Sequence, residues 1–107
     1  MKKAEVYMRR HLAGCLIEDE NGYHFSYYSS FLQSSDAEAV SLTLPLSEVE
    51  FHSKTMFPFF DGLIPEGWLL NIAEKNWKID RRDRMSLLMH TCRDCIGAVS
   101  ILPGEIE

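Results

Sequence analysis

The feature that constrains this fold most is an Asn21-Gly22 pair set between two runs of apolar residues. Both residues of such a pair tolerate a positive φ, which the tightest hairpin turns require. The run before it, residues 12–17, is largely apolar. In the run after it, residues 23–27, aromatic side chains alternate with the polar side chains of His24 and Ser26. Alternation with a period of two is typical of a half-buried strand. The sequence therefore predicts an antiparallel β-hairpin at Asn21-Gly22.

Two further alternating runs extend this hairpin into a meander. Residues 4–8 predict a strand that precedes it. Residues 40–46 predict a fourth strand that follows it, and Pro45 marks the end or edge of that strand because proline cannot donate a ladder hydrogen bond. The polar segment between these strands, residues 29–39, is expected to be irregular, with Phe31 and Leu32 as anchors. The apolar face of the fourth strand would carry Val40, Leu42, Leu44 and Leu46.

After about residue 56 the pattern changes from a period of two to helical spacing. Pro65 suits the first turn of a helix, where its missing N–H costs nothing, and Glu66 complements the helix dipole there. A second helix is expected to begin at Asp80, which can cap it. The apolar face of the first helix would be Leu69, Ile72, Ala73 and Trp77, and that of the second would be Met85, Leu88, Met89 and Cys92.

Residues 98–102 form a short apolar run that Pro103-Gly104 ends, and this run predicts a closing strand that returns to the sheet. The fold class is therefore α+β: an antiparallel β-meander with two packed helices and a short closing strand. A chain of 107 residues fits one domain, so residues 1–107 are taken as a single domain.

Charge and composition exclude several classes of protein. A net charge of −5 argues against a nucleic-acid-binding module, which normally carries a basic surface. The sequence contains no run of about 18 apolar residues, the length that a membrane-spanning helix needs. The number of cysteines, three, is odd, which suggests a reducing compartment rather than a set of disulfides. The N-terminus also lacks the apolar run of a signal peptide. These features predict a cytoplasmic protein that binds neither membranes nor nucleic acids.

The residues that usually carry catalysis are not arranged for it here. Cys92 and Cys95 have the CxxC spacing, but one such pair cannot complete a tetrahedral zinc site. Neither a phosphate-binding loop nor a kinase catalytic loop is present. We therefore expect no catalytic residues, no metal site and no cofactor. The histidines are expected to be scattered surface or hydrogen-bonded residues: His11, His24, His52 and His90.

An aromatic segment at residues 57–68 is the most unusual part of the chain. Pro and Gly residues fix the backbone between its large side chains, and these side chains can either pack the helices onto the sheet or contact another protein. Trp68 would lie in the first turn of the first helix, and an exposed Trp is strongly enriched in binding hot spots. The predicted partner-binding residues are Phe59, Phe60, Asp61, Leu63, Ile64, Pro65, Glu66, Gly67, Trp68 and Leu69.

These segments resemble a known family. FFDGLIPEGW at residues 59–68 and RDCIGAV at residues 93–99 are similar to the N-terminal subdomain of HipA-family toxin kinases. The resemblance covers nearly the whole chain and implies a HipA N-terminal-like domain. In that family the subdomain continues into a kinase body, whereas this chain ends at Glu107, so no kinase domain and no family catalytic residue is expected.

The resemblance implies a free-standing, HipS-like antitoxin of a tripartite HipBST toxin–antitoxin system. Such a protein would bind and inhibit a HipT-like serine/threonine toxin kinase in trans, and a HipB-like DNA-binding protein could join the complex. Three alternatives stay open: an accessory subunit that completes and activates a truncated HipA-like kinase, an inert fragment of a kinase gene, and a thiol enzyme. Trp68 is the residue expected to intrude on the kinase.

Overall fold

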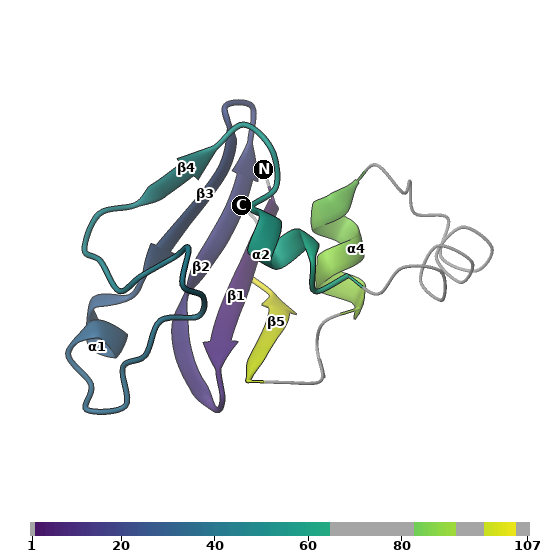
Figure 1. Ribbon diagram of the computed structural model, residues 1–107. Coiled ribbons are helices and arrows are strands. Elements are labelled where there is room, and N and C mark those ends of the chain that lie inside the picture. The colour runs from purple at the N-terminus through teal and green to yellow at the C-terminus, as the bar shows by residue number, and fades with distance from the viewer. Residues whose placement is uncertain (1, 65–82, 92–97, 105–107) are drawn as a thin grey trace.

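The computed structural model describes residues 2–64, 83–91 and 98–104. Its centre is a five-stranded antiparallel sheet in the order β4-β3-β2-β1-β5 (Figure 1). The described helices are α1 (Ser29–Leu32), α2 (Pro58–Asp61) and α4 (Arg84–Thr91). This confirms the α+β class. The strands are β1 (Lys2–Met8), β2 (His11–Asp19), β3 (Gly22–Tyr27), β4 (Phe51–Ser53) and β5 (Val99–Pro103).

The predicted hairpin joins β2 to β3. Asp19 pairs with Gly22, so the two turn residues are Glu20 and Asn21 rather than Asn21 and Gly22. Gly22 alone takes the positive φ, at +120°, and a Cβ there would lie 2.4 Å from the carbonyl oxygen of Ser53. The side chain of Asp19 accepts the backbone N–H of Asn21 at 2.8 Å and fixes the turn.

The fourth strand that the sequence predicts at residues 40–46 is wrong. Apart from one isolated bridge between Ser41 and Leu44, these residues form a loop. Val40 and Leu44 are buried, whereas Leu42 between them is fully exposed. The buried positions are thus four residues apart, because a tight turn replaces the strand. The strand that pairs with β3 is β4, which begins at Phe51, five residues after the end of the predicted run.

Tyr27 explains why this loop stays on the sheet. Its hydroxyl donates to the carbonyl of Leu44 and accepts the backbone N–H of Val40 at 3.0 Å. Two backbone groups that a strand would satisfy are thereby satisfied by one side chain. Burial raises the pKa of Tyr27, although the hydrogen bond from Val40 opposes that change.

The second predicted helix is present as α4, and Met85 and Leu88 are fully buried as expected. Asp83 lies just before the helix and accepts the backbone N–H of Ser86 at 3.1 Å, which is the bond that an N-cap makes. The predicted cap at Asp80, the first predicted helix and Cys92 all lie outside the described residues.

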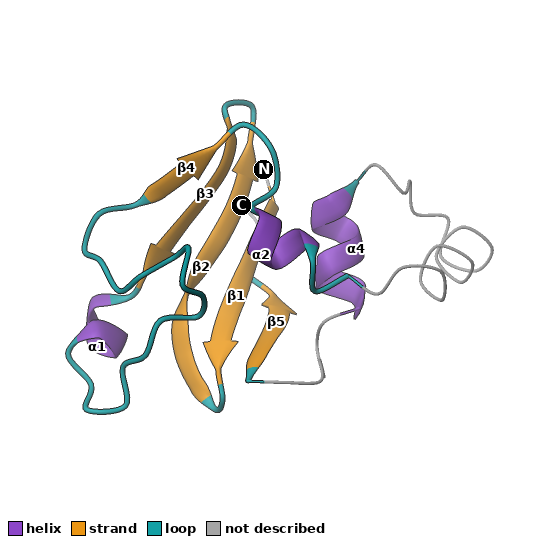
Figure 2. Cartoon of the chain, viewed as in Figure 1, coloured by secondary structure: helices purple, strands orange, loops and turns teal. Residues whose placement is uncertain are grey.

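The closing strand is also confirmed, because β5 pairs antiparallel with β1 along the edge of the sheet. One face of the sheet packs against α2 and α4 to form the core (Figure 2). Within the described residues, no helix is long and apolar enough to cross a bilayer. The largest fully buried side chains in the core are those of Phe25, Phe60, Leu16, Met85, Leu87, Leu88, Ile101 and Val6.

Candidate partner-binding surface

The first half of the predicted partner-binding segment is the short helix α2. Pro58 begins the helix, where its fixed φ suits the first turn. Phe60 is fully buried, with its ring centroid 5.3 Å from that of Phe25 on β3. Phe57 and Ile64 are buried as well. The aromatic side chains on this side of α2 therefore attach the segment to the sheet, as the first interpretation of the cluster requires.

The outward side of α2 remains accessible. Phe59, Asp61 and Leu63 are half-buried, and Pro58 and Gly62 are exposed. Phe59 packs edge-on against Phe60, with the ring centroids 5.2 Å apart. Phe60 and Ile64 thus anchor the segment in the core. The half-buried side chains beside them, those of Phe59, Asp61 and Leu63, are the ones that another protein could reach.

An ion pair joins this segment to α4. The Arg84 Nε atom lies 2.6 Å from Asp61 Oδ1, and both side chains are partly exposed. A pair in such a setting contributes at most about 1 kcal/mol. Pro65, Glu66, Gly67, Trp68 and Leu69 lie outside the described residues, so their part of the prediction stays a prediction.

The outer face of the sheet carries a second accessible surface. It is an open hollow next to the β1–β5 edge, and Leu12 at its rim is 40% exposed. Tyr28 donates to Glu5 there, at 2.8 Å, and burial together with this hydrogen bond raises the pKa of the tyrosine. The residues that line the hollow are Lys3, Glu5, Tyr7, Leu12, Tyr28, Pro103 and Gly104.

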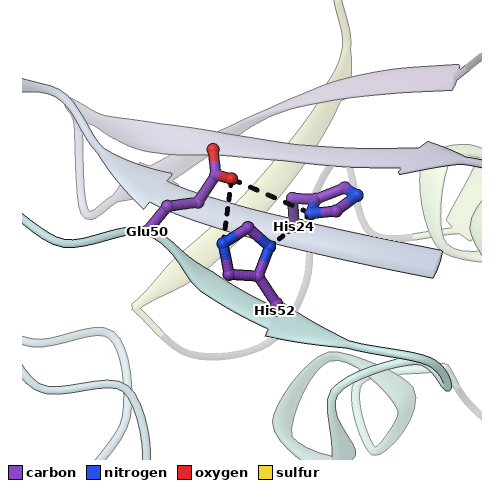
Figure 3. Close-up of side chains that lie close together, drawn as sticks. All are labelled: His24, Glu50 and His52. Carbon is purple, nitrogen blue, oxygen red and sulfur yellow. Dashed lines mark hydrogen bonds and ion pairs between the residues drawn. The ribbon is translucent and has the colours of Figure 1, made fainter. Parts of the chain in front are cut away.

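The described histidine side chains, those of His11, His24 and His52, are exposed or hydrogen-bonded as expected, but two of them are neighbours rather than scattered. His24 on β3 and His52 on β4 are direct register partners, and their Nδ1 atoms lie 2.6 Å apart. Glu50 approaches both rings (Figure 3). The alternation around Phe25 could have placed His24 on the outer face. His52 could not have been found, because the sequence pattern put the neighbouring strand at residues 40–46.

Among the described residues, His24, Glu50 and His52 are the group that could hold a metal ion. Their ligand atoms all lie within 4.8 Å of one another. The hydrogen bond from His24 lowers the pKa of Asp19, and a second hydrogen bond, from the backbone of Asn21, adds to this. Cys15 is a buried free thiol that lies 3.7 Å from the Ser26 hydroxyl, whereas Cys92 and Cys95 lie outside the described residues.

In the described part of the chain, the fold is a small α+β domain in which α2 and α4 pack against one face of the sheet and an open hollow lies on the other. The sequence matches the family described as the HipA N-terminal domain over residues 4–102. The chain therefore belongs to the HipA N-terminal domain family, as the motifs at residues 59–68 and 93–99 predict.

Two relatives place the chain more closely. An uncharacterized protein of Haemophilus influenzae is 34% identical over 101 residues, which cover 94% of this chain and 92% of that protein. A solved structure of the N-terminal domain of HipA toxin superposes with a TM-score of 0.76 at 30% identity. That match covers 100% of this chain and 96% of the solved one. The family resemblance is thus confirmed in both sequence and fold.

Proposed function

We propose that this domain is an antitoxin that binds a HipA-type toxin kinase in trans and inhibits it. The observation that carries the proposal is the family match over residues 4–102, because this domain is the non-catalytic part of HipA-family kinases. Membership in the family fits a component of a toxin–antitoxin system. The partner would be a HipT-like kinase that lacks this domain, and a HipB-like DNA-binding protein could join the two.

The physical requirement for binding in trans is an interface that compensates for lost tethering. A domain fused to its kinase acts at an effective concentration of about millimolar. A separate domain has no such help and must bury roughly 800 Å² of its own surface to bind stably. Phe59 and Leu63 are half-buried apolar side chains on a segment that Phe60 anchors in the core, and they are proposed to contribute to this interface together with the predicted residues up to Leu69.

Inhibition requires a group that blocks the active site or holds the kinase in an inactive shape. We assign this role to Trp68, with Glu66 and Leu69 beside it. A large aromatic side chain next to a segment anchored in the core can enter a pocket without much loss of its own conformational freedom.

The test is co-expression of this chain with a HipT-like kinase, scored by cell growth. The wild-type chain is expected to restore growth, and Trp68→Ala is expected to lose the rescue while its thermal unfolding is unchanged. Leu42→Ala, which removes a fully exposed apolar side chain from the loop at residues 40–46, is the matched control and should rescue normally. If Trp68→Ala instead unfolds the domain, with a loss of about 3–5 kcal/mol typical of a core residue, the assigned role is wrong.

The same experiment separates the alternatives by sign. An accessory subunit that completes the kinase would deepen growth arrest rather than relieve it. An inert fragment would change nothing. A thiol enzyme would lose its effect in a Cys92→Ser, Cys95→Ser variant, whereas an antitoxin that acts through Trp68 would keep it.

A further inference from the structure

A cluster of metal-ligating side chains lies at the β3–β4 edge of the sheet, away from α2. His24 Nδ1 is 2.6 Å from His52 Nδ1 and 3.8 Å from Glu50 Oε1. His52 Nε2 is 3.4 Å from the same oxygen. The pairing of β3 with β4 fixes the two histidines opposite each other, and Glu50 precedes β4 directly (Figure 3).

A second carboxylate orients the inner histidine. Asp19 Oδ1 lies 2.9 Å from His24 Nε2, so that nitrogen carries the proton and donates it to Asp19. The lone pair of His24 is therefore on Nδ1, the atom that faces His52 and Glu50. A carboxylate behind a histidine is the arrangement that fixes the tautomer of histidines that bind metals.

The short distance between the histidines has a chemical consequence. Two imidazole nitrogens at 2.6 Å must share a proton, since two lone pairs repel each other. A divalent cation can bind between these two nitrogens when the rings separate slightly, since each Zn–N bond is about 2.0–2.1 Å long. The proton of neutral His52 then sits on its Nε2 atom, which lies 3.4 Å from Glu50 Oε1. Glu50 lies where its charge would offset that of the cation.

The exposure of the three side chains fits an open site. The exposed fraction is 16% for His24, 43% for Glu50 and 60% for His52. One ligand is thus mostly buried, and the other two reach the solvent at the edge of the sheet. Two nitrogens and one carboxylate oxygen form a donor set that zinc accepts, and water would complete a tetrahedral site.

We propose that His24, His52 and Glu50 bind one Zn²⁺ ion, with Asp19 as the residue that orients His24. The ion would connect the three-residue strand β4 to β3 and so stabilise the edge of the sheet. This site is independent of the proposed antitoxin function and lies on different residues from the partner-binding segment.

The test is calorimetric titration of ZnCl₂ into the tag-free, chelator-treated chain, together with thermal unfolding. Wild-type protein is expected to bind about one equivalent, and at free zinc 100-fold above Kd its melting temperature should rise by roughly 10 °C. His24→Ala and His52→Ala should lose both effects. His11→Ala is the matched control, because His11 is exposed, forms an ion pair with Asp36 and lies outside the proposed site, and it should bind like the wild type.

Two further variants keep the result specific. A Cys92→Ser, Cys95→Ser variant should retain the binding, and loss of binding there would overturn the proposal by placing the zinc on the thiols. Asp19→Asn should weaken the affinity about 10- to 100-fold, the usual effect of losing a residue that orients a ligand. A wild-type affinity equal to that of His24→Ala, with both proteins folded by circular dichroism, would also overturn it.

Discussion

At the scale of single residues, Tyr27 has the clearest structural role. Its hydroxyl satisfies two backbone groups of the loop at residues 40–44 inside the core. We expect Tyr27→Phe to lower the free energy of unfolding by roughly 1–3 kcal/mol, because it leaves a buried N–H and a buried C=O without a partner. Urea denaturation measures the change. A variant as stable as the wild type would show that water satisfies these groups.

Asp83 makes a second prediction at this scale, about pH. Burial acts to raise its pKa, but hydrogen bonds from Lys2 and Ser86 outweigh burial and lower the pKa in the folded state. The stability that this carboxylate adds is therefore fully present above the pKa of about 3.9 that an unfolded Asp has, and it is lost as the pH falls below that value.

Asp83→Ala should cost roughly 1 kcal/mol of stability at pH 7, the usual effect of removing a helix cap. The difference between wild type and variant should shrink as the pH falls from 4 to 2, since the wild-type carboxyl is protonated there. Thermal unfolding of both proteins across that range measures it. A difference that stays constant with pH would contradict the assigned hydrogen bonds to the carboxylate.

At the scale of elements, variants in the loop at residues 40–46 distinguish the observed turn from the strand that the sequence predicts. In a strand, Leu42 and Leu44 would lie on the same face and matter equally, whereas here Leu44 is 3% exposed and Leu42 is fully exposed. We expect Leu44→Ala to cost about 2–5 kcal/mol and Leu42→Ala to leave the melting temperature unchanged. Equal losses in the two variants would contradict the loop.

The same loop shows where sequence patterns stop being informative. The hairpin at residues 21–22, the strands that flank it, α4 and the closing strand could be predicted, because each has a local period and a local turn or cap. The pattern at residues 40–46 has a strand's period, yet the tertiary contact with Tyr27 overrides it. β4 has only three residues, too few for any period to be visible.

The candidate sites could likewise be predicted from the sequence only in part. The aromatic segment could be found from its composition, but which of its side chains face inward could not, since α2 is a single turn that packs through Phe60. The His24–His52 pair depends on the register between β3 and β4, which connects positions 28 residues apart. Only the folded sheet brings these two residues together.

At the scale of the whole molecule, one face of the sheet packs into the core, and the two proposed binding sites lie on different parts of the domain. The predicted partner-binding segment includes α2, whereas the proposed zinc site lies at the β3–β4 edge. The two can therefore be tested by separate variants of one chain. Loss of zinc binding in His24→Ala should leave kinase binding intact, and Trp68→Ala should leave zinc binding intact.

The proposed function requires that this domain bind a HipT-like kinase that lacks such a domain. Surface plasmon resonance with an immobilised HipT-like kinase, followed by a phosphorylation assay on the same mixture, tests it most directly. We predict saturable binding at sub-micromolar concentrations of the wild-type chain, together with a fall in phosphorylation that follows occupancy. The absence of binding, or binding that raises phosphorylation, would contradict the account.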